Sequence, residues 1–188
     1  MLFRSLTAPS ELPVWRLLFN DFSGVEFNIE DFANFVDEQI SGTSWRIPVQ
    51  ASLEKDIDCL IRMYSTRSLR GRQTIDDIMD SPFRNLNLIN PTPSDELTFR
   101  ISIGEKPYLN EFLVLYTCLD FMILNDPGTK SATTTRLARD PGSPGRLLKL
   151  SEEDLLSYLE KSTLEVEGVT IASPAGSSQL IVEGSHHD

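Results

Sequence analysis

The side chains best suited to metal chemistry lie between Ser52 and Asp58. This segment reads Ser-Leu-Glu-Lys-Asp-Ile-Asp and holds the carboxylates of Glu54, Asp56 and Asp58. Carboxylate oxygens are the ligands that Mg²⁺ takes in proteins, commonly one or two of them with waters completing the shell. We therefore expect these three residues to be the Mg²⁺ ligands, with Asp56 and Asp58 as the catalytic pair.

Helical periodicity divides these carboxylates between faces. Apolar residues recur at helical spacing between Leu53 and Tyr64, which predicts a helix that begins at Ser52. In a helix, residues 54 and 58 share a face and residue 56 points elsewhere. A lysine at 55 and an arginine at 62 could also pair with these carboxylates, so a solvated or salt-bridged helix face is the alternative interpretation.

Basic residues form two groups that could contact nucleic acid. The net charge of −11 argues against broad non-specific binding, because such binding requires Lys and Arg to neutralise phosphates. A local basic strip is still compatible with that charge, and a solvated basic surface is the alternative. The first group is Arg62, Arg67, Arg70 and Arg72, the second is Lys130, Arg136, Arg139, Arg146 and Lys149, and Arg84 stands apart among asparagines.

Several other chemistries lack the residues that they need. The only histidines, His186 and His187, stand at the C-terminal end, so histidine-based nucleophilic catalysis and structural zinc are not expected. No nucleotide-binding fingerprint occurs. Cys59 and Cys118 fall in apolar stretches, which predicts reduced core cysteines. No apolar run has the length of a membrane span, so we expect a cytoplasmic protein.

The order of these patterns predicts a mainly α fold of winged helix-turn-helix-like units with short β-hairpins. A first unit is expected within residues 1–105, a second within 106–184, and a disordered tail at 185–188. Expected helices of the first unit are 12–20, one from Asn28, one from Ser52, 75–79 and one from Pro82, followed by a strand at 97–103.

The second half repeats this order of elements. Ser151 is a predicted N-cap with Asp154 three residues later, and residues 140–145 predict a rigid turn. Expected elements are helices at 109–124, 131–139 and from Ser151, then hairpin strands at 166–172 and 178–182.

Together these segments resemble the C-terminal half of SspB-type proteins, which belong to bacterial DNA phosphorothioation and anti-phage systems. The resemblance covers residues 12–183 and implies a magnesium-dependent DNA-nicking endonuclease, which opens one strand so that partner proteins can install sulfur. The residues that carry the resemblance are Leu53–Asp58, Tyr64, Asp76–Phe83, Leu86–Ile89, Gly142–Arg146 and Leu150.

Under this resemblance, the metal would polarise a phosphodiester and activate a water, and arginines would hold the DNA backbone. The family's N-terminal region, with a His-Glu-x-Phe-type motif followed by arginines, does not occur in this sequence. We therefore leave open whether this chain is itself the enzyme. The expected DNA-binding residues are Arg62, Arg67, Arg70, Arg72, Arg84, Arg136, Arg139 and Arg146.

The alternative is a non-enzymatic winged-helix module that binds DNA or docks a sulfurtransferase or ATPase. The segment after Ser151 carries Glu152, Glu153, Asp154 and Glu160, and phosphates would repel such a helix. Carboxylates gathered beside a basic groove would favour the enzyme. Carboxylates that are dispersed and paired to arginines would favour the module.

Overall fold

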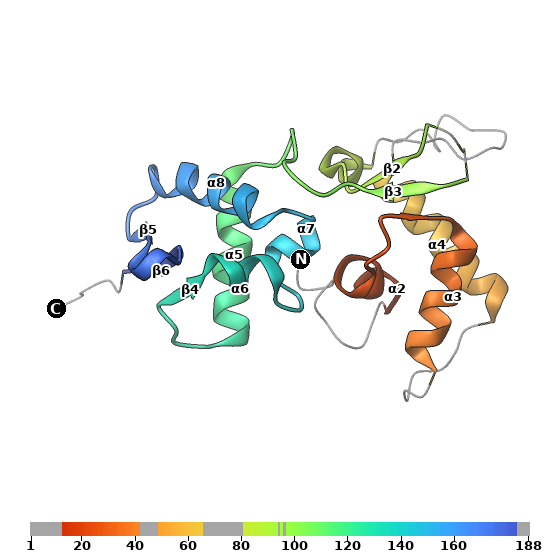
Figure 1. Ribbon diagram of the computed structural model, residues 1–188, viewed down its shortest axis with the longest axis horizontal. Coiled ribbons are helices and arrows are strands. Elements are labelled where there is room, and N and C mark those ends of the chain that lie inside the picture. The colour runs from red at the N-terminus through yellow and green to blue at the C-terminus, as the bar shows by residue number, and fades with distance from the viewer. Residues whose placement is uncertain (1–12, 42–48, 66–80, 94, 96, 184–188) are drawn as a thin grey trace. The chain divides into compact units, whose positions relative to one another are not determined.

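The computed structural model describes residues 13–41, 49–65, 81–93, 95 and 97–183. The chain divides into two compact units, Met1–Ser102 and Ile103–Asp188, and the described part of each holds helices and a three-stranded antiparallel sheet (Figure 1). The prediction of a mainly α chain is confirmed. The helix expected at 75–79 and the tail at 185–188 lie outside the described residues.

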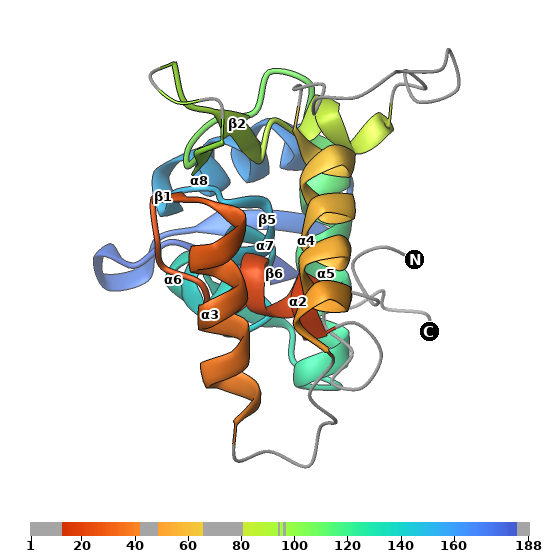
Figure 2. The same ribbon diagram turned by 90° about the vertical axis from the view of Figure 1, so that its right-hand side faces the viewer.

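The first unit runs helix, strand, two helices and two strands. Its sheet has the order β1-β3-β2, and α3 packs beside α4 (Figure 2). Its elements are α2 (Pro13–Arg16), the π-helical turn η1 (Leu17–Asp21), β1 (Glu26–Phe27), α3 (Ile29–Ile40), α4 (Gln50–Tyr64), the 3₁₀ helix η3 (Pro82–Leu86), β2 (Ile89–Pro91) and β3 (Phe99–Ile101).

The start of α3 is fixed by a reciprocal pair of hydrogen bonds. The backbone N–H of Asp31 donates to Oδ1 of Asn28 at 2.8 Å, and the backbone N–H of Asn28 donates to Oδ2 of Asp31 at 3.2 Å. The predicted cap at Asn28 is thereby confirmed. Because both orphan donors are satisfied locally, the start of this helix needs no tertiary contact.

The helix α4 differs from its prediction in two respects. It begins at Gln50, before Ser52, and its N-cap Val49 makes no side-chain hydrogen bond. Cys59 was expected in the core and is exposed, because it lies opposite the buried stripe that runs from Leu53 to Tyr64. Cys118, by contrast, is buried as predicted, and its burial raises the pKa of its thiol.

The second unit has a similar order, with three α-helices rather than two between its first strand and its last two strands. Its sheet, β4-β6-β5, again pairs the first strand with the last, and α5 packs against α8. Its elements are α5 (Glu111–Asn125), β4 (Ser131–Thr133), α6 (Thr134–Arg139), α7 (Pro144–Leu148), α8 (Glu152–Thr163), β5 (Val169–Ala172), the 3₁₀ helix η4 (Pro174–Gly176) and β6 (Gln179–Val182).

Two boundaries in this unit differ from their predictions. Residues 131–133 were expected to be helical but form β4, because they pair with β6. The expected turn at 140–145 ends at Ser143, whose Oγ accepts a hydrogen bond from the backbone N–H of Arg146 at 3.4 Å. A Cβ on Gly145 would lie 2.6 Å from the Cα of Ala138. Only glycine therefore lets α7 approach the backbone of α6 this closely.

The predicted cap and hairpin at the C-terminal end of this unit are confirmed. The backbone N–H of Asp154 donates to Oγ of Ser151 at 3.0 Å, and β5 and β6 pair in antiparallel register. In the part of the chain that the structure describes, no helix has the length and apolar character needed to cross a membrane.

Candidate functional site

The acidic segment lies on the solvent side of α4. Glu54 and Asp56 are exposed, and Asp58 is half-buried. Oδ2 of Asp58 lies 2.8 Å from Nη2 of Arg62, one turn further along the helix. The side-chain amide of Gln50 donates to Oε1 of Glu54 at 3.2 Å. Two of the three carboxylates are therefore held by neighbours on the same helix.

These carboxylates do not make a magnesium site by themselves. Glu54 and Asp58 share a helix face that Asp56 does not reach. Across the described residues, no three His, Cys, Asp or Glu side chains are placed to hold a metal ion together. The assignment of Mg²⁺ to Glu54, Asp56 and Asp58 therefore stays a prediction, and their geometry supports no metal-dependent step.

The arginines expected beside this segment are only partly described. Arg67, Arg70 and Arg72 lie outside the described residues. Nε of Arg84 donates to the carbonyl oxygen of Arg62 at 3.2 Å, which ties η3 to the last turn of α4. Arg62 itself is paired with the carboxylate of α4 described above. Both described arginines thus contact the chain's own groups.

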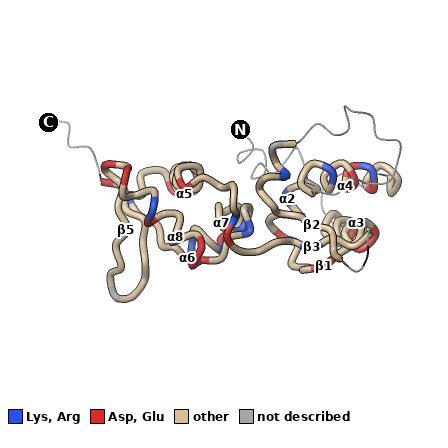
Figure 3. Tube along the Cα trace, turned by 90° about the horizontal axis from the view of Figure 1, so that it is seen from above, with Lys and Arg blue, Asp and Glu red and all other residues tan. Residues whose placement is uncertain are grey.

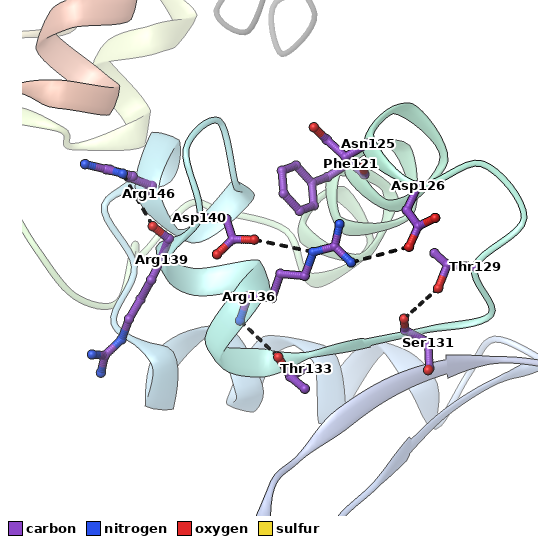
Figure 4. Close-up of polar contacts among 10 residues, drawn as sticks. All are labelled: Phe121, Asn125, Asp126, Thr129, Ser131, Thr133, Arg136, Arg139, Asp140 and Arg146. Atoms are coloured by element: carbon purple, nitrogen blue, oxygen red, sulfur yellow. Dashed lines mark hydrogen bonds and ion pairs between the residues drawn. The ribbon is translucent and has the colours of Figure 1, made fainter.

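Arg136 joins the end of α5 to α6. Its Nη1 lies 3.7 Å from Oδ2 of Asp126, and its Nε lies 3.4 Å from Oδ2 of Asp140 (Figure 4). The side chain is 34% exposed, so water screens these pairs only in part. Because two carboxylates of the chain neutralise the guanidinium of Arg136, it attracts a phosphate only weakly.

Arg139 and Arg146 make weaker contacts of the same kind. Nη2 of Arg139 lies 3.4 Å from Oε2 of Glu152, which links α6 to the first turn of α8. Nη1 of Arg146 donates to the carbonyl oxygen of Arg139 at 3.5 Å (Figure 4). Arg139 is 74% exposed, so this ion pair is largely screened and Arg139 could exchange it for another anion.

Glu152 is the centre of a polar network at the start of α8. Its Oε1 accepts hydrogen bonds from the hydroxyls of Thr135 at 2.6 Å and Thr134 at 3.2 Å. Beside this network lies a cleft of about 430 Å³. The cleft is lined by Thr134, Thr135, Glu152, Glu153, Leu156, Gly176, Ser177 and Ser178. Its carboxylates and hydroxyls make it a surface for cationic rather than phosphate groups.

The helices α4 and α8 occupy equivalent places in their units. Each is the last α-helix of its unit and precedes its last two strands. The first turn of α8 carries three acidic residues, and α4 carries both acidic and basic residues (Figure 3). Acidic residues suit the positive end of a helix, which explains those of α8 without a ligand.

Sequence patterns missed the buried lysine Lys106. Only 1% of it is exposed, and its backbone exchanges hydrogen bonds with the hydroxyl of Tyr158, which donates at 2.8 Å and accepts at 3.1 Å. Burial lowers the pKa of Lys106 to about 8, and the charge of Asp154 opposes that shift. A lysine in a non-periodic connection gives no signal of burial, so the sequence alone could not have identified it.

Comparison with known proteins identifies relatives of this chain. A family model described as "Protein of unknown function (DUF4007)" matches residues 2–188. No curated protein matches the chain. A solved structure described as "SspB crystal structure" has a TM-score of 0.79 and 28% identity, covering 93% of this chain and 50% of that one.

A second solved structure is described as "Magnesium ion-bound SspB crystal structure". It has a TM-score of 0.79 and 27% identity, and it covers 91% of this chain and 49% of that one. The chain therefore spans about half the length of both solved structures.

Proposed function

This chain belongs to the DUF4007 family and is SspB-like, and on that premise we propose that it is the C-terminal part of a cytoplasmic DNA-nicking protein that acts in DNA phosphorothioate modification and phage defence. The observation that carries the proposal is the likeness to SspB over 93% of the chain at a TM-score of 0.79. The likeness extends over both units of the chain. Because one fold can serve several functions, the side chains of the two units are also considered.

Within such a protein, the two units act as winged-helix-like modules that dock a sulfurtransferase or ATPase partner. The shared order of helix, strand, helices and two strands supports this assignment. In a winged helix, the helix before the wing is the one that usually enters a DNA groove. Here the corresponding helix α8 begins with three acidic residues, which phosphates would repel and a basic protein surface would attract.

The paired arginines favour this docking role. Arg62, Arg136 and Arg139 each have a carboxylate partner in the chain, and these carboxylates are dispersed over both units. DNA contact by this part would require those pairs to break. Each exposed pair is worth less than about 1 kcal/mol, so DNA could still displace some of them.

Magnesium-dependent nicking by Asp56 and Asp58 is the second candidate. It is supported by the description of one similar structure as magnesium ion-bound. The described residues do not complete a metal site around these carboxylates, so no catalytic step is assigned to them.

Deletion of the gene in a strain that carries it tests the proposed function. Phosphorothioate linkages are cleaved by iodine, so on a denaturing gel, which separates the strands, iodine-treated genomic DNA from the parent strain should fragment and DNA from the deletion strain should not. Restoring the wild-type gene should restore fragmentation. Iodine-sensitive linkages that persist in the deletion strain would contradict the proposal.

A paired set of variants separates docking from catalysis. In a plasmid-nicking assay with Mg²⁺, the protein that contains this chain is compared with Asp56→Ala plus Asp58→Ala. A control, Glu165→Ala plus Glu167→Ala, removes the same charge from exposed positions of the other unit. Docking predicts that both variants nick within about twofold of wild type, since neither change touches a catalytic group. Loss of nicking in the first variant alone would establish the second candidate.

A further inference from the structure

Arg139 and Glu152 form an ion pair in which only the carboxylate is held in place by further groups. Oε1 of Glu152 accepts hydrogen bonds from the hydroxyls of Thr135 at 2.6 Å and Thr134 at 3.2 Å, and its Oε2 lies 3.4 Å from Nη2 of Arg139. Thr134 is buried, and its backbone N–H donates to the carbonyl oxygen of Ser178 at 2.9 Å. The side chain of Arg139 is 74% exposed and that of Glu152 is 32% exposed. Arg139 can therefore leave the pair while Glu152 stays fixed.

The other arginines of this unit have different surroundings. Arg136 is half-buried and paired with two carboxylates, so an incoming anion would have to displace both of them. Within the described residues, Arg146 pairs with a neutral group, the carbonyl oxygen of Arg139, and keeps its full charge. In Figure 4 the side chains of Arg139 and Arg146 lie on the same side of α6, away from Arg136. Release of Arg139 from Glu152 would therefore place two charged guanidinium groups close to one another.

A carboxylate and a phosphate compete for the same guanidinium. Both are oxyanions that accept charge-assisted hydrogen bonds from the N–H groups of an arginine. While Arg139 faces Glu152, its charge is partly neutralised, so contact with the DNA backbone requires Arg139 to leave the pair. For an exposed ion pair, this competition weakens the binding of DNA by up to about fivefold.

Glu153 provides an internal comparison for Glu152. Both carboxylates lie in the first turn of α8, where either one suits the positive end of the helix. Glu153 is exposed, and within the described part of the chain its side chain makes no ion pair. A difference between the neutral variants of these two residues therefore reports the pair with Arg139 rather than the charge of the helix.

We propose that Glu152 is an intramolecular competitor of DNA phosphate, which holds Arg139 away from the DNA backbone. The inference rests on the proposed role in DNA modification for the choice of DNA as the anion. It can fail while phosphorothioation still depends on the gene, because DNA affinity and iodine-sensitive linkages are measured separately.

DNA-binding titrations of two matched variants test this inference. A fluorescein-labelled DNA duplex is titrated with the 188-residue chain, and its anisotropy is read between about 50 and 200 mM salt. Glu152→Gln removes the charge but keeps an oxygen that the threonine hydroxyls can reach, and Glu153→Gln is the control. We expect Glu152→Gln to bind DNA about threefold more tightly than Glu153→Gln. Its plot of log affinity against log salt should be steeper by about 0.9, because one more arginine reaches a phosphate.

Arg139→Gln shows whether the gain passes through Arg139. In the Glu152→Gln background it should remove the whole gain. In wild type it should weaken DNA binding by less than about twofold, because Glu152 already holds Arg139 away from the DNA. The wild-type arm does not depend on the stability of the Glu152→Gln variant.

Four results would overturn the inference. Equal affinity and equal salt slope of the two glutamine variants would show that Glu152 acts only through net charge. A gain that persists without Arg139 would assign it to another cation. A large loss of binding in Arg139→Gln alone would show that Arg139 contacts DNA in wild type. Absence of binding by both wild type and Glu152→Gln would show that Glu152 is not what limits contact with DNA.

Discussion

Replacing Lys106 with Met should stabilise the second unit at neutral pH. Lys106 is 1% exposed, and burial lowers its pKa from 10.5 to about 8. One pKa unit corresponds to 1.36 kcal/mol, so burying the charged ammonium costs up to about 3 kcal/mol at pH 7. Met keeps most of the apolar stem and removes the charge. The pKa of about 8 already includes the attraction of Asp154, so the cost of about 3 kcal/mol is the upper limit of the gain, and we expect a net gain of roughly 1–3 kcal/mol.

The sign of the pH dependence follows from the lowered pKa. Below pH 8 the lysine is charged in both states, and the full cost of burial is present. Between pH 8 and 10.5 it is neutral when folded and charged when unfolded, so unfolding takes up a proton and stability rises with pH. The advantage of Lys106→Met should therefore shrink as the pH rises from 8 towards 10.5.

Urea unfolding at pH 7, 8, 9 and 10 measures this effect. Circular dichroism reports both units, whereas Trp15 and Trp45 lie in the first unit, so tryptophan fluorescence supplies an internal control. Lys130→Met, at an exposed lysine of the same unit, is the matched control and should change stability by less than about 0.5 kcal/mol. A Lys106→Met variant less stable than wild type at pH 7, or a gap independent of pH, would refute the reasoning.

Two further predictions concern stability. Gly145→Ala should destabilise the second unit by about 1–3 kcal/mol in urea unfolding, because the new Cβ would lie 2.6 Å from the Cα of Ala138; an unchanged midpoint would show that α6 and α7 are not held this closely. Asn28→Ala should cost the first unit about 1 kcal/mol by loss of the α3 cap, and Asn28→Ser should restore most of it; equal stability of Asn28→Ala and wild type would show that the cap contributes nothing.

Local signals in the sequence predicted the capped helices well. Asn28 and Ser151 cap their helices through bonds to residues three positions away, so a short stretch of sequence contains the whole interaction. The hairpin of β5 and β6 was equally predictable from the sequence, because alternating apolar residues flank a proline–glycine turn. The expected start of α4 at Ser52 was wrong, since the helix begins at Gln50 with Val49 as an N-cap that makes no side-chain hydrogen bond, and such a start has no capping signal in the sequence.

The candidate site was less predictable, because its geometry depends on distant residues. Helical spacing alone already separated Asp56 from Glu54 and Asp58. The sequence could not show that Arg136 bridges Asp126 and Asp140, because the first pair joins two different helices. Arg136 and Arg139, which belong to a basic group in the sequence, therefore form ion pairs with carboxylates of the chain in the structure.

The sequence by itself determined the mainly α character, the caps, the hairpin and the resemblance to SspB-type proteins, because each depends on neighbouring residues or on residue identity. The tertiary structure decided that residues 131–133 form a strand with β6, that Lys106 is buried and that one apolar face of α5 is left in water. These features depend on which segments pack together. Burial and strand pairing are properties of contacts between remote residues, and periodicity within one segment does not record them.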